Sequence, residues 1–240
     1  MHSPFVFEFI TKVMNDKTKY QEYEEIENLR KQLLSDKTRI AVNDLGAGSV
    51  TGKTNSRQVG SIAKSAAKPP RVAQLLFRMV KFYKPSTVIE LGTSLGITTA
   101  YLAKANVVSK VVTMEGAEEI ANLARENFNK LDLRNVELVR GNFDDTLDKV
   151  LQKCGTPDFV FVDGNHRKEP TLRYFHQILP LCGNNSILIF DDIHWSEEME
   201  EAWREIKMHE SVRATIDIFY FGIVLFRSEF LEGRHFKIRF

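Results

Sequence analysis

The chain of 240 residues has the length of one large domain, or of one domain with an N-terminal addition. Its 43% hydrophobic and 27% charged residues are typical of a globular protein, and a net charge of +1 excludes a strongly basic nucleic-acid binder. No apolar run reaches the roughly 20 residues that cross a bilayer, and no signal peptide is recognisable. Cys154 and Cys182 lie outside metal and redox spacings. We therefore expect a cytoplasmic protein without a membrane partner.

The N-terminal part of the chain differs in pattern from the rest. Apolar residues at helical spacing predict two helices within the first 38 residues, and Arg39–Leu45 is a short β-like run. The polar, basic stretch from Ser49 to Lys68 is expected to form a mobile loop or lid, with helix in its second half. We predict that residues 1–68 are a helical and lid-like extension of a main domain at 69–240.

From Pro70 onward, strands and helices are expected to alternate. The predicted strands are short and apolar: Thr87–Leu91, Val111–Glu115, Val136–Arg140, Phe159–Asp163 and Ile187–Asp191. The predicted helices are Thr98–Ala105, Ala117–Leu131, Asp144–Lys153, Glu169–Cys182 and Glu197–His209. Such alternation is typical of a parallel sheet covered on both faces.

Two β-rich runs close the chain. Arg213–Tyr220 and Phe221–Arg227 meet at Gly222 and predict an antiparallel hairpin at the sheet edge. The predicted fold class is therefore α/β: a doubly wound, mostly parallel, seven-stranded sheet with an antiparallel C-terminal hairpin and N-terminal helices.

The turn after the first strand predicts a ligand site. Glu90, Gly92 and Gly96 give the pattern E-x-G-x-x-x-G, with Thr93 and Ser94 inside it. Open α/β sheets bind ligands beyond the carboxyl ends of their strands, and glycine lets the backbone approach a ligand closely. All five residues are therefore candidates for binding a cofactor, although an ordinary tight turn is the alternative.

The glycine spacing favours one class of cofactor over another. A dinucleotide fingerprint, G-x-G-x-x-G, would need glycine at Ser94 and Ile97. S-adenosylmethionine (SAM) carries an amino group and a sulfonium but no phosphate. An acid near the turn suits it, and Glu90 would hold its ammonium directly or through water.

The ends of the next two strands add further candidates. Glu115, followed by Gly116, ends the second strand, where a carboxylate can accept hydrogen bonds from both ribose hydroxyls. Asn142 and Phe143 follow the third strand and would frame adenine. A helix cap at Glu115 and a core position for Phe143 are the alternatives.

Together these motifs resemble the catechol and caffeoyl-coenzyme-A type of SAM-dependent O-methyltransferase and related bacterial methyltransferases. The resemblance rests on the loop at Glu90, the acid at Glu115 and the segment Gly141–Asp144, and it covers about residues 69–227. It implies the class I methyltransferase layout, SAM as cofactor and a small hydroxylated aromatic acceptor. The oligomeric state stays open, a homodimer included.

The resemblance also implies roles at the ends of strands four and five. In metal-dependent members, an Asp and an Asp-Asn pair hold one divalent cation, which would assign Mg²⁺ or a similar ion to Asp163, Asp191 and Asp192. Asp192 departs from the usual Asn. His166 stands where the family has a lysine base, so we predict His166 as the base, with His194 second. Asp163 is expected beside the reacting atoms and in contact with the cofactor. Related members work without metal, and loop capping by Asp191 and Asp192 is the alternative.

Three rival functions remain at this stage. Ala47–Thr54, with Lys53, resembles a phosphate-binding loop, but Ala47 replaces its first glycine and polar residues follow. Methylation of an RNA nucleoside is a second rival, because Val50–Ile89 holds eight basic residues and no acid. A SAM-binding module without catalysis is the third. A small-molecule acceptor is favoured.

Overall fold

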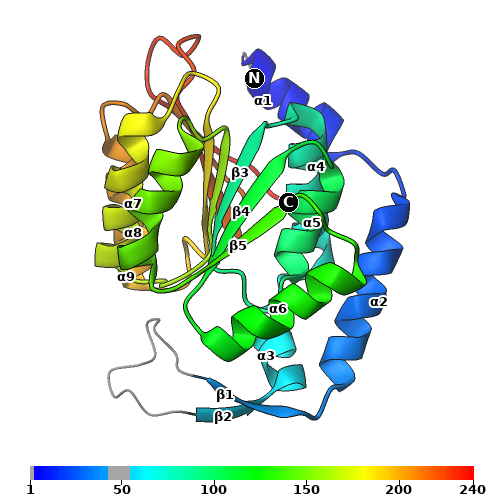
Figure 1. Cartoon of the computed structure of the whole chain (residues 1–240). Coiled ribbons are helices and arrows are strands. Elements are labelled where there is room, and N and C mark those ends of the chain that lie inside the picture. Colours follow the sequence, from blue (N-terminus) through cyan, green and yellow to red (C-terminus); the bar gives the residue numbers. More distant parts are fainter. Residues whose placement is uncertain (1–2, 43–54) are drawn as a thin grey trace.

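The computed structural model describes residues 3–42 and 55–240 and has a central sheet between two layers of helices (Figure 1). The strand order is β10 (Arg234–Lys237), β8 (Ala214–Asp217), β9 (Phe221–Leu225), β7 (Ile187–Asp191), β6 (Phe159–Val162), β3 (Thr87–Leu91), β4 (Lys110–Glu115) and β5 (Val136–Arg140). One face carries α4 (Pro70–Tyr83), α5 (Ile97–Ala105) and α6 (Glu118–Lys130), and the other carries α7 (Phe143–Cys154), α8 (Lys168–Ile178) and α9 (Glu197–Met208). No helix in these two described ranges is long and apolar enough to span a bilayer.

The predicted fold class is confirmed. Strands β3, β5 and β7 have their predicted bounds, and β4 and β6 differ from theirs by one residue. Strands β5, β4, β3, β6 and β7 pair in parallel, so their carboxyl ends meet at one edge. Helix α8 is shorter than predicted: it ends at Ile178, and a 3₁₀ turn (Leu179–Leu181) follows because Pro180 has no N–H to continue the helix.

The strand count and the place of the hairpin are corrected by the structure. The sheet has eight strands rather than seven, because β10 pairs in parallel with β8. The predicted hairpin of β8 and β9 forms, but it is not the edge: β9 lies between β7 and β8, antiparallel to both. Strand β10 escaped prediction because Arg234, His235 and Lys237 are exposed and only Phe236 is half-buried. Its pairing comes from main-chain bonds rather than an apolar pattern.

The two predicted N-terminal helices are present and share the core of the sheet. They are α1 (Pro4–Glu8), which continues into a π-helical turn (Phe9–Met14), and α2 (Gln21–Ser35). Phe9 and Ile26 are fully buried in the same hydrophobic cluster as Phe77 and Tyr101. Described residues of the first 42 share this core with the helices of the main domain. The predicted division of the chain into residues 1–68 and 69–240 therefore stays a prediction.

The described part of the expected lid is more regular than predicted. β2 (Asn55–Gln58) pairs antiparallel with β1 (Arg39–Val42), and α3 (Val59–Ala66) supplies the helix expected in the second half. Val59 and Ile62 bury the apolar side of α3. The loop at Ala47–Thr54 that resembles a phosphate-binding motif, with Lys53, lies outside the described residues.

Candidate active site

The turns after β3 and β6 touch at a glycine. Gly92 has φ +106°, and a Cβ built there would lie 2.0 Å from the carbonyl oxygen of Asp163. The Asp163 N–H donates to the carbonyl of Leu91 over 2.8 Å. Gly96 begins α5 with φ +81°, where a Cβ would meet the Phe128 ring at 2.4 Å. Only glycine fits both places. The two glycines of the E-x-G-x-x-x-G pattern are therefore explained by close contacts within the protein: Gly92 with the backbone of Asp163, and Gly96 with the ring of Phe128.

Glu115, at the end of β4, fixes the turn after β3. One carboxylate oxygen accepts the Ser94 N–H over 2.8 Å, and the other accepts the Ala117 N–H over 2.9 Å. Ser94 takes a left-handed conformation, with φ +47°. The neighbouring Thr93 points into the core, where its hydroxyl lies 2.6 Å from that of Thr113. Glu115 therefore orients the turn, and Thr93 anchors it from below.

Glu90 lies beneath the turn and is wholly buried. Its Oε2 accepts hydrogen bonds from Thr99 over 2.5 Å and Thr113 over 2.6 Å, while its Oε1 has no hydrogen-bond partner among the described residues. Burial raises the pKa of Glu90 to about 8, against the two threonine hydrogen bonds. Glu90 does not line the cavity, so its predicted contact with the methionine ammonium stays a prediction.

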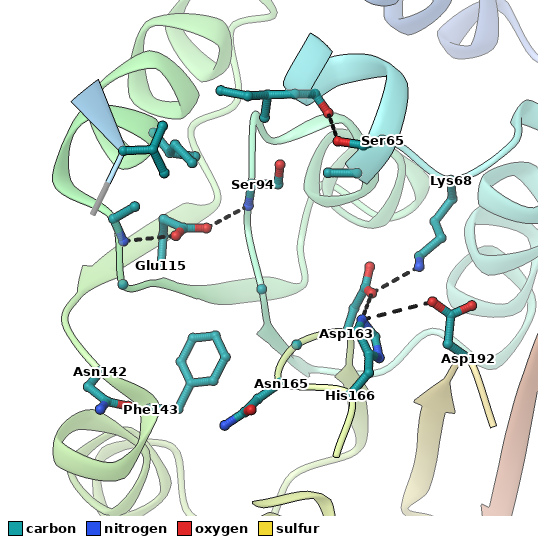
Figure 2. Close-up of a pocket in the computed structure, with 18 of the residues that line it drawn as sticks. Ser65, Lys68, Ser94, Glu115, Asn142, Phe143, Asp163, Asn165, His166 and Asp192 are labelled. Carbon is teal, nitrogen blue, oxygen red and sulfur yellow. Dashed lines mark hydrogen bonds and ion pairs between the residues drawn. The ribbon is translucent and has the colours of Figure 1, made fainter. Parts of the chain in front are cut away.

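A cavity of about 470 Å³ lies along this edge of the sheet (Figure 2). Its volume is in the range of small-molecule sites, roughly 300–1,000 Å³. The predicted cofactor residues that line it are Gly92, Ser94, Glu115, Gly116, Asn142, Phe143 and Asp163. Val42, Arg57, Ile62 and Ser65 of the N-terminal part also line it. The extension thus supplies one wall of the cavity.

Phe143 and Asn142 are held in place at the start of α7. A Cβ on Gly164 would lie 2.7 Å from the Phe143 ring, which meets Tyr174 edge-on with 6.0 Å between ring centroids. The Asn142 side chain caps α7 by accepting the Asp144 N–H over 3.2 Å. An aromatic face fixed in this way can stack on a flat ring.

Lys68 is a site residue that sequence reasoning missed. Its ammonium lies 2.9 Å from Asp163 Oδ1 and hydrogen-bonds Asp191 Oδ2. The side chains of Lys68 and Asp191 are 13% and 1% exposed, so this ion pair is buried. Burial opposes the charged ammonium, but the carboxylates of Asp163, Asp191 and Asp192 outweigh it and raise the pKa of Lys68 above its ordinary value. The sequence showed Lys68 only as one member of a basic stretch.

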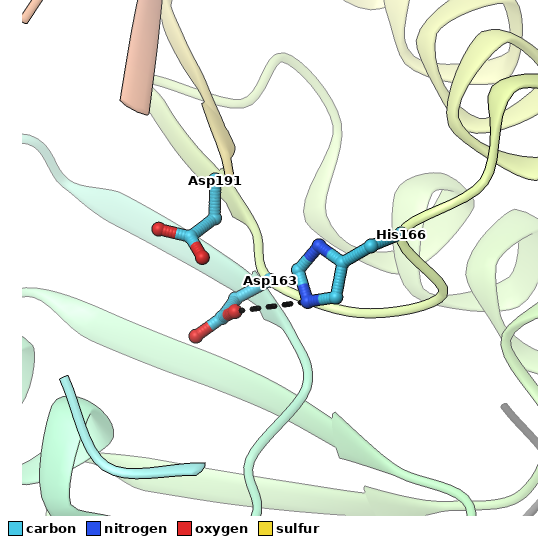
Figure 3. Close-up of side chains that lie close together, drawn as sticks. All are labelled: Asp163, His166 and Asp191. Atoms are coloured by element: carbon cyan, nitrogen blue, oxygen red, sulfur yellow. Dashed lines mark ion pairs between the residues drawn. The ribbon is translucent and has the colours of Figure 1, made fainter. Parts of the chain in front are cut away.

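The predicted metal trio is only partly brought together. Asp163, Asp191 and His166 have ligand atoms within 4.8 Å of one another (Figure 3). Asp192 turns elsewhere: its carboxylate lies 3.9 Å from His166 Nε2, which is itself 3.7 Å from Asp163 (Figure 2). Lys68 already occupies the position between Asp163 and Asp191. A divalent cation therefore does not fit between these carboxylates while the ammonium is there.

His194, the second candidate base, has a different environment from His166. Its Nδ1 lies 3.1 Å from Glu200 and its Nε2 lies 2.9 Å from Asp217. The ring stacks on Phe219 and does not line the cavity, whereas His166 does. His194 thus connects α9 to β8, and the geometry favours His166 as the base.

Comparison with known proteins agrees with this geometry. Residues 89–193 match the profile of a family described as a methyltransferase domain. A catechol O-methyltransferase from Niastella koreensis is 24% identical to the chain over 127 residues, which are 52% of this chain and 57% of that enzyme. The match thus spans little more than half of the relative's own length.

Solved structures share the fold of most of the chain, the N-terminal part included. An O-methyltransferase from Bacillus cereus in complex with SAH superposes with a TM-score of 0.62 and 19% identity, covering 92% of this chain and 97% of its own. The O-methyltransferase TomG from Streptomyces achromogenes, in complex with SAM, gives 0.61 and 15%, covering 93% and 95%. At these identities the likeness establishes the fold.

Glu90 generates a prediction about stability and pH. The folded protein holds the Glu90 proton up to a pKa of about 8, whereas the unfolded chain loses it near the ordinary value of 4.5. The stability contributed by this proton is complete below pH 4.5 and is lost as the pH rises through 8. Glu90→Gln cannot titrate, so the unfolding free energy of the parent should fall relative to this variant by about 1.4 kcal/mol per pH unit across that window.

Urea unfolding at several pH values between these limits measures the difference. Glu126→Gln, at an exposed position of α6, is the matched control and should keep the pH slope of the parent. Equal slopes for the parent and Glu90→Gln would contradict a raised pKa at Glu90.

Proposed function

We propose that this chain is a SAM-dependent methyltransferase that methylates a hydroxyl oxygen of a small aromatic acceptor. One observation carries the proposal: a single cavity joins Glu115, Asn142 and Phe143 at one end to Lys68 and His166 at the other (Figure 2). The first group suits a nucleoside and the second suits the proton chemistry of a hydroxyl group. The similar structure from Bacillus cereus is a complex with SAH, and the one from Streptomyces achromogenes is a complex with SAM. Both support SAM as the cofactor here.

At the cofactor end, each group has a distinct task. Glu115 accepts the ribose hydroxyls through carboxylate lone pairs, because its two backbone N–H bonds orient it toward the turn. The ring of Phe143 stacks on adenine, and Asn142 lies beside it. Glu90 lies buried beneath the turn, and its Oε1, which has no hydrogen-bond partner among the described residues, is the acceptor for the methionine ammonium, directly or through water. The sulfonium methyl then points toward the end of the cavity that holds Asp163.

At the acceptor end, the reaction is an in-line displacement. The acceptor oxygen attacks the methyl carbon while the bond from carbon to sulfur breaks, and the electron pair stays on the sulfur of SAH. His166 Nε2 takes the hydroxyl proton, a role that suits histidine near neutral pH. Asp163 and Asp192, 3.7 Å and 3.9 Å from that nitrogen, stabilise the imidazolium that forms. Holding the oxygen against the methyl carbon supplies much of the rate enhancement.

The shape and charge of the site favour a small acceptor over RNA. Two basic residues of the stretch Val50–Ile89 have partners inside the protein and do not face solvent as a phosphate-binding surface would. Lys68 pairs with buried carboxylates, and Arg78 donates to the carbonyl of Val13 over 2.7 Å. Trp195 lines the cavity and is 74% exposed, so it offers an aromatic face at the rim. Such a face can stack on a planar acceptor ring.

Cofactor binding is tested by calorimetry with SAH. Glu115→Ala should weaken SAH binding about 10- to 100-fold, because hydrogen bonds to a charged group contribute about 1.5–3 kcal/mol. Glu119→Ala, an exposed neighbour on α6, should bind like the parent. Thermal unfolding of both variants shows that they are folded. Tight binding that Glu115→Ala leaves unchanged would contradict the assignment of the ribose site.

Catalysis is tested with labelled SAM and simple catechols as acceptors. The parent should form the methyl ether and SAH, and His166→Ala should lose about 10²- to 10⁴-fold in turnover, since a general base contributes that much. His176→Ala, exposed on α8, is the control and should retain the parent's rate. Methylation of tRNA without methylation of phenols would favour the RNA alternative. SAH binding without any transfer would favour a non-catalytic module.

A further inference from the structure

Lys68 occupies the position that a metal ion would need in this cavity. We propose that its ammonium is the resident cation of the site, so that the chain works without a divalent metal and uses Lys68 to hold the acceptor oxygen. The part about the acceptor rests on the proposed function, whereas the exclusion of a metal does not. Lys68 is then a residue that binds substrate. It belongs to the short segment between α3 and α4.

The geometry of the cluster carries the first step. Lys68 follows α3, Asp163 follows β6 and Asp191 ends β7, so three separate segments converge on one nitrogen atom. The Lys68 nitrogen contacts both carboxylates, at 2.9 Å from Asp163 and in a hydrogen bond to Asp191. Mg²⁺ and Ca²⁺ bind carboxylate oxygens at about 2.0–2.6 Å. Ammonium and metal would therefore compete for the same two oxygens.

Burial and charge carry the second step. Asp191 is 1% exposed and Asp163 is 11% exposed, so neither carboxylate can rely on water for its solvation. Two buried carboxylates this close repel each other unless a cation lies between them. Among the described residues, Lys68 is the cation whose ion pairs reach both of them. Removing its charge should create a demand for another cation at the same place.

The backbone around Lys68 carries the third step. Pro69 and Pro70 follow it directly, and Pro70 begins α4. Proline fixes its own φ and restricts the backbone of the residue before it. The backbone at Lys68 is therefore more restricted than that of an ordinary loop residue. A lysine held at both its backbone and its charged end loses little further freedom when a ligand binds.

The donor count carries the last step. An ammonium group has three N–H donors; Asp191 accepts one of them in a hydrogen bond, and Asp163 is an ion-pair partner at 2.9 Å. Lys68 lines the cavity together with His166. A remaining N–H donates to the acceptor oxygen, and this charge-assisted bond strengthens as negative charge builds up during proton removal by His166. The lysine thus orients the oxygen and stabilises it, while His166 removes the proton.

Metal binding tests the proposal without any need for turnover. Electron paramagnetic resonance titrations with Mn²⁺ should show no site in the parent. Lys68→Met should bind Mn²⁺ at least about tenfold more tightly than the parent, because one positive charge near two carboxylates is gone. Adding Asp163→Asn to that variant should abolish the new site. Lys64→Met, exposed on α3, is the matched control and should behave like the parent.

Activity and binding supply the second readout. The parent should transfer methyl groups equally well in EDTA and in Mg²⁺. Lys68→Met should lose about 10²-fold in turnover while its affinity for SAH stays within about twofold, because Lys68 contacts the acceptor rather than the nucleoside. Lys68→Gln provides a second variant if Lys68→Met fails to fold.

Two outcomes would overturn the proposal. One is a parent that binds Mn²⁺ at this cluster and loses its activity in EDTA. The other is a folded Lys68→Met protein that neither gains a cation site nor loses turnover. If the parent neither binds SAH nor transfers methyl groups, the proposed function fails, and the Mn²⁺ titrations alone still decide whether Lys68 replaces a metal.

Discussion

Two carboxylates buried side by side at one edge of a parallel sheet are the constraint on which this site depends. Strands β6 and β7 are neighbours and parallel, so their carboxyl ends place Asp163 and Asp191 together whatever their side chains prefer. Burial makes this pair costly unless a positive charge compensates it. Lys68 provides that charge from a segment that precedes Asp163 by 95 residues and Asp191 by 123 residues. The ion cluster therefore secures the path of the chain between α3 and α4 over the sheet.

This constraint explains why the N-terminal part belongs to the site. Once Lys68 is held at the sheet edge, α3 and the β1–β2 ribbon lie beside the cavity, and Ile62, Ser65 and Arg57 become part of its wall. Helix α2 supports this arrangement by packing on α3 and α5. Residues 89–193, which match the family profile, contribute Glu115, Phe143 and His166 to the cavity, and the segment before α4 contributes Lys68.

The sequence predicted the features that have a local pattern. Short apolar strands and amphipathic helices gave β3, β5 and β7 their bounds, and Gly92 marked a turn that only glycine can make. Lys68 could not be predicted, because its partners Asp163 and Asp191 are distant in sequence and its neighbours are ordinary basic residues. Strand β10 has almost no apolar residues to reveal it. His166 follows β6 and His194 follows β7, so their positions in the sequence suggested similar roles. The ring of His194 is instead directed away from the cavity by its contacts with Glu200 and Asp217, which the sequence does not reveal.

A crystal structure of the parent grown with SAH and excess Mn²⁺, with anomalous data at the manganese edge, tests the central claim most directly. The account predicts SAH along the cavity with its ribose at Glu115 and its adenine on Phe143. It also predicts the Lys68 nitrogen between Asp163 and Asp191, with no anomalous peak there. A manganese peak between these carboxylates with Lys68 displaced, or SAH bound outside this cavity, would contradict it.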